Sequence, residues 1–395
     1  MRIARSGLCL GICALAAIVM AALPAQAQQP LKIGLILPYT GQFTDASGQI
    51  DDAIKLYIKQ HGDTVAGRKI EVIRRDDGGS PDVAKRMARE LAVNDNVDIL
   101  AGFAITPEAL AVADVSEQAK KLMVVMNAAT AIITTKSPYI VRSSLTIPQV
   151  NEAFGAWVYK NGTRKVYTLV SDYAPGHDAE GAFSRAFKEA GGEIVGSLRI
   201  PLANPDFSAF VQRIKDANPE AIYIFVPGGA QPAALAKAMV ERGMDTNKIK
   251  ILGQGEITEE NALRGMGEAA LGIITAFHYD YNHDSKLNKD FVAAFNADYK
   301  HNPDFFGMGG YDGMHVIYEA LKKTNGKSDG DALIAAAKGL AWESPRGPVS
   351  IDPQTRDIIQ TVYFRKVEKV GGALKNVEIG KVENVKDPVK ARMPQ

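Results

Sequence analysis

Short apolar, β-branched runs alternate along this chain with longer stretches in which apolar residues recur every three or four positions. Runs of the first kind predict strands at 32–37, 69–74, 98–102 and 122–126. The second spacing predicts an amphipathic helix over 45–59, where it is kept by Ile50, Ala53, Ile54, Tyr57 and Ile58. Strands that alternate with helices are typical of βαβ units, so we expect an α/β fold with a mostly parallel sheet.

The same order of elements begins again after Pro148. It predicts strands at 165–171, 193–200, 221–226 and 250–253, separated by helices at 149–159, 179–190, 207–217 and 231–242. The repeating unit is the size of a domain and too long for a solenoid repeat. We therefore expect two similar three-layer α/β/α lobes.

The C-terminal segment is too small and too mixed for a third domain. It predicts a strand at 271–277, helices at 287–300 and 311–323, and then short strands at 349–351, 361–367 and 376–382. We therefore assign one part of this segment to each lobe. The N-terminal lobe is then 28–148 plus 278–350, and the C-terminal lobe is 149–277 plus 351–395. Several crossings of the chain between two lobes predict a hinge.

The first 27 residues are typical of a secretory signal peptide. Arg2 and Arg5 precede an apolar run over 8–23, and Ala25-Gln26-Ala27 forms a cleavage pattern. Both cysteines of the chain lie inside this segment. We therefore expect an exported protein that begins at Gln28 and holds no disulfide, thiol nucleophile or thiolate-bound metal.

The charge composition argues against a polyanionic partner. The chain has 46 Lys plus Arg against 45 Asp plus Glu, which gives a formal net charge of +1, and it has no long basic run. Proteins that bind nucleic acid carry a basic patch or stripe. We therefore expect no nucleic-acid partner, and beyond residue 27 we find no apolar run that predicts a membrane span.

Motifs for nucleotide, metal or nucleophilic chemistry are missing from the sequence. It contains no G-x-x-x-x-G-K-[ST], H-E-x-x-H or G-x-S-x-G. Segment 253–255 begins like a dinucleotide loop, but Thr258 stands at the third glycine position, and the spacing of His278 and His283 fits no helical metal pair. We expect no catalytic residue, no cofactor and no metal, and hence a binding protein. A secreted α/β hydrolase is the alternative.

Small and polar residues follow the ends of the predicted strands. These loops are 38–41 with 47–48, 103–106, 127–130, 171–173, 227–229 and 255–256. The carboxyl ends of parallel strands meet at one edge of a sheet, where open α/β sheets bind ligands. Loop 103–106 also leads into a helix N-terminus, whose N–H groups favour a carboxylate. Each loop alone fits turn chemistry, but six of them on facing lobes indicate a ligand cleft.

Several of these segments resemble a known family. LKIGLILPYTGQFTDASGQ, VDILAGFAITPEALAVADV, YTLVSDYAPGHDAEGAFSRAFKEAGGEIVG and FGMGGYDGMHVIYEAL are similar to the leucine-binding-protein branch of bacterial periplasmic solute-binding proteins, which serve ABC importers. The resemblance implies a type I periplasmic-binding fold with three crossovers. It also implies a periplasmic location, a monomer, and the permease subunits of an importer in the inner membrane as partners. The ligand would be an amino acid or a related small carboxylate, held by closure of the lobes.

The resemblance also implies the residues of the site. The ligand carboxylate would lie against Ser47, Phe103, Ala104, Ile105, Thr106, Ala129 and Thr130. Tyr173 and Gly229 would line the other lobe, and Glu256 falls near the acid that pairs with the α-ammonium in amino-acid binders. Two ligand classes stay open. Glu256 favours an amino acid of the branched-chain type, whereas Tyr39, Phe103 and Tyr173 suit an aromatic acid of the benzoate or cinnamate type.

Overall fold

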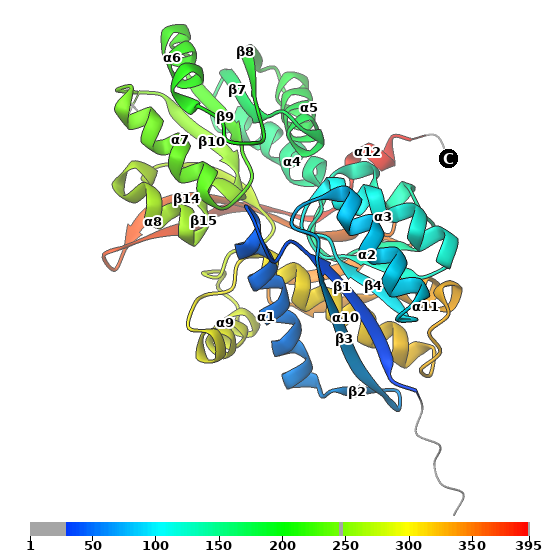
Figure 1. Ribbon diagram of the computed structural model, residues 1–395. Helices are drawn as coiled ribbons and strands as arrows, with labels where there is room; N and C mark the ends of the chain where they lie inside the picture. Colours follow the sequence, from blue (N-terminus) through cyan, green and yellow to red (C-terminus); the bar gives the residue numbers. More distant parts are fainter. Residues whose placement is uncertain (1–28, 245–247, 394–395) are drawn as a thin grey trace, which may run out of the picture.

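The computed structural model describes residues 29–244 and 248–393. The signal peptide predicted at 1–27 lies outside the described residues. The chain forms two lobes, each built on its own sheet, with the long strands β14 (Ile358–Val370) and β15 (Ala373–Val385) running behind the junction between them (Figure 1). In the described part of the chain, no helix combines the length and apolarity that crossing a membrane requires.

The first lobe is built on a six-stranded sheet in the order β2-β3-β1-β4-β5-β6. Its elements are β1 (Leu31–Leu37), α1 (Thr44–His61), β2 (Thr64–Val65), β3 (Arg68–Asp76), α2 (Pro81–Val93), β4 (Ile99–Gly102), α3 (Thr106–Ala119), β5 (Leu122–Val125), η1 (Ala131–Thr135) and β6 (Ile140–Arg142). All pairs except β2 with β3 are parallel. One face packs on α1 and the C-terminal helices α10 (Phe305–Lys323) and α11 (Gly330–Ala337), and the other face packs on α2 and α3.

The second lobe repeats this arrangement. Its elements are α4 (Ile147–Lys160), β7 (Lys165–Ser171), α5 (Ala174–Glu189), β8 (Glu193–Ile200), α6 (Phe207–Ala217), β9 (Ala221–Phe225), α7 (Ala230–Glu241), β10 (Lys250–Gln254), η2 (Gly255–Thr258), α8 (Glu260–Met266), η3 (Gly267–Ala270) and β11 (Ile274–Phe277). Strands β8, β7, β9, β10 and β11 are parallel in that order. Helices α4 and α5 cover one face, and α6, α7 and α8 cover the other.

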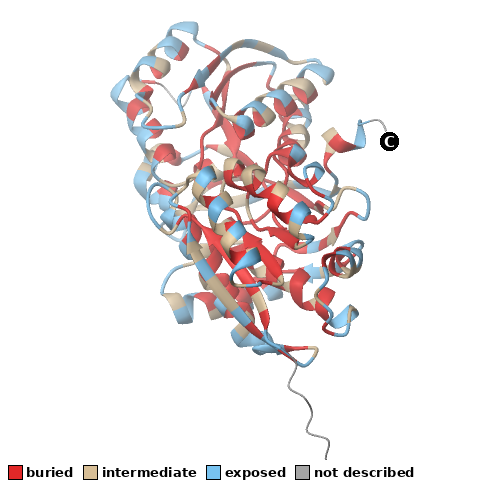
Figure 2. Ribbon diagram, turned by 45° about the vertical axis from the view of Figure 1, so that its right-hand side comes forward, coloured by how far each residue is buried: buried red, intermediate tan, exposed pale blue. Residues whose placement is uncertain are grey.

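The C-terminal segment serves both lobes. It contains α9 (Lys286–Tyr299), α10 (Phe305–Lys323), α11 (Gly330–Ala337), β12 (Ala341–Ser344), β13 (Gly347–Ile351), β14 (Ile358–Val370), β15 (Ala373–Val385) and α12 (Pro388–Ala391). Helices α10 and α11 complete the core of the first lobe, whereas β14 pairs antiparallel with β11 of the second. In both lobes the central strands are buried and the outer helix surfaces are exposed (Figure 2).

The predicted α/β class and the two-lobed architecture are confirmed, whereas several local predictions differ. Elements α8, α11 and β12 were not predicted, and α5 begins five residues before its predicted start. Strand β6 was not predicted, because a three-residue strand leaves almost no periodic pattern. The strands predicted at 361–367 and 376–382 are parts of one longer hairpin, β14 and β15. Helix α10 begins at Phe305, six residues before the predicted start, within a glycine-rich stretch. The division of the chain into lobes by residue number stays a prediction.

Three connections run between the halves of the molecule: 143–146 after β6, 278–285 after β11, and 352–357 before β14. Three fully buried arginines lie around these connections. Arg142 pairs with Asp357 at 3.3 Å, and Arg365 pairs with Asp280 at 3.0 Å. The third, Arg346, pairs with Asp312 at 2.7 Å. Because each guanidinium also donates to backbone carbonyls of neighbouring segments, the three connections are tied together at the hinge.

Candidate ligand-binding site

A pocket lies between the lobes, at the carboxyl ends of the strands in both sheets. Its lining comes from both lobes and consists of Phe43, Ala46, Ala104, Ile105, Thr106, Asn127, Ala128, Ala129, Ile147, Tyr173, Pro175, Phe225, Pro227, Gly228, Glu256 and Phe306. The free volume between these residues is about 40 Å³. The lobes touch beside the pocket, where the Ala131 N–H donates to Asp178 Oδ2 of α5 at 2.9 Å.

The first lobe contributes two rigid loops that follow β4 and β5. The Thr106 hydroxyl donates to Thr130 Oγ1 at 3.0 Å, which fastens one loop to the other. Asn127 Nδ2 donates to the Ala104 carbonyl at 2.6 Å, whereas its buried Oδ1 has no hydrogen-bond partner within the described residues. Helix α3 starts at Thr106 and presents its N-terminal end to the pocket, so this side favours a negatively charged group.

Aromatic rings from both lobes form the walls of the pocket. Phe43 precedes α1, and Phe306 lies in the first turn of α10. Tyr173 and Phe225 come from the second lobe, with ring centroids 6.3 Å apart. Rings in a tilted arrangement at this separation form an apolar surface against which a planar ring packs well.

One carboxyl group, that of Glu256, lies in the pocket. It accepts hydrogen bonds from the Gly228 N–H at 3.0 Å and from Gln254 Nε2 at 3.1 Å. Burial raises the pKa of Glu256 to about 7, although these hydrogen bonds oppose the shift. Neither Lys nor Arg is among the described residues that line the pocket. The pocket is therefore apolar, with one titratable acceptor at its second-lobe end.

Six of the eleven residues proposed from the sequence lie in this pocket: Ala104, Ile105, Thr106, Ala129, Tyr173 and Glu256. Two others stand directly behind or beside it. Thr130 supports Thr106 through the hydrogen bond described above, and Gly229 begins α7 next to Gly228 of the lining.

The remaining three candidates have side chains elsewhere. The Ser47 hydroxyl is buried in α1 and donates to the Pro38 carbonyl at 2.7 Å. Tyr39 lies outside the pocket, and its buried hydroxyl is beside Arg74 and Asp51. Phe103 has a positive φ of 66° and belongs to the core beneath α2 and α3, on the far side of the loop from the pocket.

Several pocket residues were not singled out from the sequence, although a signal for some of them was present. Asn127, Pro227 and Gly228 stand in loops that were recognised at strand ends. Phe306 lies about two hundred residues after the loop 104–106 in the sequence, and only the fold brings it to the cleft. Phe43 and Phe225 look like ordinary apolar residues beside a helix and in a strand.

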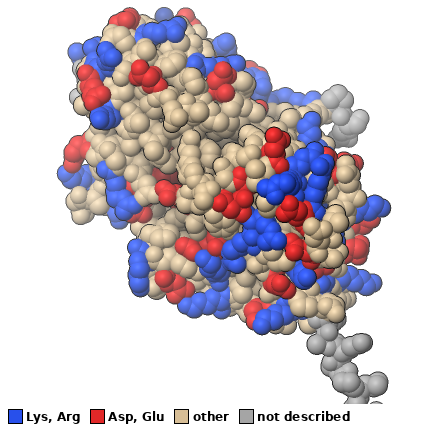
Figure 3. Space-filling view, viewed as in Figure 1, with Lys and Arg blue, Asp and Glu red and all other residues tan. Residues whose placement is uncertain are grey.

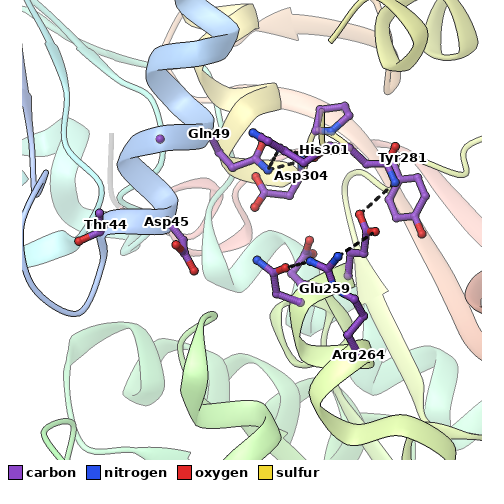
Figure 4. A pocket seen from close by; sticks show the side chains of 13 residues that line it. Thr44, Asp45, Gln49, Glu259, Arg264, Tyr281, His301 and Asp304 are labelled. Carbon is purple, nitrogen blue, oxygen red and sulfur yellow. Dashed lines mark hydrogen bonds and ion pairs between the residues drawn. The ribbon is translucent and has the colours of Figure 1, made fainter. Parts of the chain in front are cut away.

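A second, more polar hollow of about 370 Å³ opens beside the first pocket. In Figure 4, Asp45 and Gln49 of α1 lie opposite Glu259 and Arg264 of the second lobe. Asp304 also lines it and caps α10 by accepting from the Phe306 and Gly307 N–H groups, while burial raises its pKa to about 7. These charged side chains favour a hydrated space, so an apolar ring is better accommodated in the first pocket.

The face of the molecule seen in Figure 3 shows no purely basic patch of the kind that binds a polyanion. On the face shown in Figure 3, acidic and basic side chains are interspersed, and the part of the upper lobe that faces the lower one is largely uncharged. Within residues 29–244 and 248–393, no group of three or more His, Cys, Asp or Glu side chains is arranged to hold a metal ion.

Comparison with known proteins identifies the family to which this fold belongs. Residues 30–373 match the periplasmic binding protein family. The chain belongs to this family. The expected type I periplasmic-binding fold and the leucine-binding-protein branch are thereby confirmed, and so is the function of a periplasmic solute-binding protein.

The relatives of this periplasmic binding protein are named for, or were solved with, two kinds of ligand. Leu/Ile/Val-binding protein homolog 6 of Brucella melitensis is 42% identical over 384 residues, which are 96% of this chain and 98% of the relative. A solute-binding protein of an ABC transporter from Rhodopseudomonas palustris BisB5, solved with 3,4-dihydroxybenzoic acid, is 55% identical with a TM-score of 0.89, and the match covers 91% of this chain and 99% of that one. Another from R. palustris HaA2, solved with p-hydroxybenzoic acid, is 40% identical with a TM-score of 0.89, covering 92% and 100%.

Proposed function

We propose that this periplasmic binding protein captures a hydroxylated benzoate between its lobes and delivers it to the permease of an ABC importer. It would be exported by the signal peptide at 1–27, act as a monomer, and bind its solute without turnover. The observation that carries the proposal is the pocket itself, in which four aromatic rings from both lobes surround a space with one carboxyl group and no cationic side chain among the described lining residues.

The solute carboxylate is assigned to the first lobe. There the N-terminus of α3 and the loop at Ala129 offer N–H groups, and the hydrogen bond from the Thr106 hydroxyl to Thr130 fastens the two loops to each other. Neutral donors at a helix N-terminus bind a carboxylate without an arginine. The ring of the solute would then lie between Phe43, Tyr173 and Phe225, and its hydroxyl groups would point toward the second lobe.

Glu256 fits a phenolic hydroxyl better than an ammonium group. An ammonium ion needs an ionised partner in a buried site, whereas the pKa of Glu256 is raised to about 7 and its oxygens already accept two hydrogen bonds. A phenolic hydroxyl donates to a carboxyl oxygen in either protonation state. The two R. palustris relatives solved with hydroxybenzoates support this choice, and the relatives named for Leu, Ile and Val support the amino-acid alternative.

Ligand-dependent stabilisation tests the assignment. We expect 3,4-dihydroxybenzoate and 4-hydroxybenzoate to raise the Tm of the purified protein, because a ligand that binds only the folded state at about 100 times its Kd contributes about 2.7 kcal/mol. Cyclohexanecarboxylate is the matched control, since it keeps the carboxylate and loses the aromatic ring. Stabilisation by leucine, isoleucine or valine with none by the benzoates would overturn the proposal in favour of the amino-acid reading.

A further inference from the structure

Two carboxyl groups are buried together directly behind the loop that lines the pocket at 104–106. Asp77 follows β3, and Glu108 stands in the first turn of α3; their exposed fractions are 1% and 0%. Glu108 Oε1 and Asp77 Oδ2 are buried and have no conventional donor among the described residues. The two side chains nevertheless interact directly with each other. A pair of facing acceptor oxygens without a donor is the arrangement that a single shared proton satisfies.

The other oxygen of each carboxyl group holds a backbone segment. Asp77 Oδ1 accepts from the Gly79 N–H at 2.9 Å, and Glu108 Oε2 accepts from the Ile105 N–H at 3.2 Å. Burial, followed by the charge of Asp77, raises the pKa of Glu108 to about 9. Glu108 therefore carries the proton at neutral pH, and its hydroxyl donates to Asp77.

Among the residues that the structure describes, no cation compensates a second negative charge at this place. Asp76 is the nearest charged neighbour in the loop, and it adds to the negative potential. On α2, which packs against α3, Lys85 already pairs with Asp114 at 2.6 Å, and Asp82, Arg86 and Arg89 are exposed. The other elements beside α3, namely β4, β5 and η1, contain no titratable residue.

We propose that the proton shared by Glu108 and Asp77 positions the 104–106 loop for the solute carboxylate, so that affinity for the solute falls when this proton is lost at alkaline pH. The inference rests on the proposed function and deepens it. Loss of the proton leaves two buried carboxylates that repel each other, and it adds a negative charge behind the loop that is to receive a negative ligand. Both effects oppose binding, so the protonated pair is the form that binds.

The test compares the affinity for benzoate at pH 8 and pH 10, measured by calorimetry. Benzoate is chosen because it has no phenolic hydroxyl that titrates in this range. Wild type should lose about five- to tenfold in affinity, the size expected if the bound carboxylate raises the pKa of the pair by about one to two units. Glu108→Gln should bind at pH 8 but lose this pH dependence, because its amide donates to Asp77 and its carbonyl accepts from the Ile105 N–H. Glu108→Ala, which keeps neither bond, should bind weakly at both pH values.

Glu117→Gln is the matched control, since it removes an exposed carboxyl group from the same helix; it should keep the wild-type pH dependence. The infrared difference spectrum between wild type and Glu108→Gln at pH 8 should contain the carbonyl band of a protonated carboxyl group, which tests the shared proton without any ligand. An unchanged fall of affinity with pH in Glu108→Gln, or no such band in the difference spectrum, would overturn the inference. If wild type does not bind benzoate at pH 8, the proposed function is overturned, and with it the effect of the shared proton on affinity. The infrared band would still test whether Glu108 and Asp77 share a proton.

Discussion

Replacing Arg346 with methionine should lower the free energy of unfolding by about 3 to 5 kcal/mol, the loss typical of breaking a buried ion pair. Arg346 is 0% exposed and pairs with Asp312, itself 1% exposed, at 2.7 Å. It also donates to the Ser144 carbonyl at 2.8 Å and to Gln360 Oε1 at 2.9 Å. Methionine restores the apolar volume of the side chain but leaves the buried charge of Asp312 without its cation.

Urea denaturation measures this change, and Arg86→Met is its matched control. Arg86 pairs with Glu90 at 3.1 Å on the surface, with side chains 59% and 39% exposed, so its loss should cost at most about 0.5 kcal/mol. Adding Asp312→Leu to Arg346→Met should recover part of the lost stability, because the unpaired charge is then removed. An effect of Arg346→Met as small as that of Arg86→Met would show that the hinge does not depend on this pair.

The location of Arg346 gives the pair a role beyond stability. Its guanidinium reaches the carbonyls of the first connection between the lobes, while Asp312 lies on α10 and Gln360 on β14. Arg346 therefore ties the first connection to α10 and β14 by directional bonds, which define one position for bending. Hinge motion that closes the cleft needs such fixed ends, since the dihedral change is absorbed by a few connecting residues.

Much of the fold could be predicted because its determinants are local. Runs such as 32–37 and 221–226 are apolar on both sheet faces, as buried parallel strands must be, and the structure places strands there. The start of α10 could not be predicted in this way. Its glycines lower helix propensity, yet they are required by close packing: a Cβ at Gly309 would lie 1.8 Å from the Met126 carbonyl oxygen, and one at Gly310 would lie 2.7 Å from that of Ile50.

The site could be predicted only as far as strand ends determine it. Residues of the loops after β4, β5, β7 and β10 reach the pocket because parallel strands end at one edge. Side-chain direction within a loop depends on single dihedral angles, and this is why the ring of Phe103, with its positive φ, lies in the core instead of the cleft. The contribution of Phe306 depends on a helix that returns from the other end of the chain, which no local pattern indicates.

Glu256→Gln should reverse the preference of the protein among benzoates. We expect the affinity for 4-hydroxybenzoate relative to benzoate to fall about tenfold or more, because a hydrogen bond to a charged group contributes about 1.5 to 3 kcal/mol and the variant keeps only a neutral acceptor. Benzoate itself should bind the variant equally well or better, since no charge is then buried against its ring. Calorimetric titration of both ligands measures the ratio.

The pH dependence of 4-hydroxybenzoate binding tests the same role of Glu256 in a second way. The pKa of Glu256 is raised to about 7 by burial, and a phenolic hydroxyl binds its ionised form more strongly. The affinity of wild type for 4-hydroxybenzoate should therefore rise between pH 6 and pH 8, and this rise should be absent from Glu256→Gln. Glu241→Gln, which changes an exposed carboxyl group on α7, should behave as wild type. If leucine instead binds wild type and does not bind Glu256→Gln, Glu256 is the partner of an α-ammonium, because only a cation requires the charge that the substitution removes.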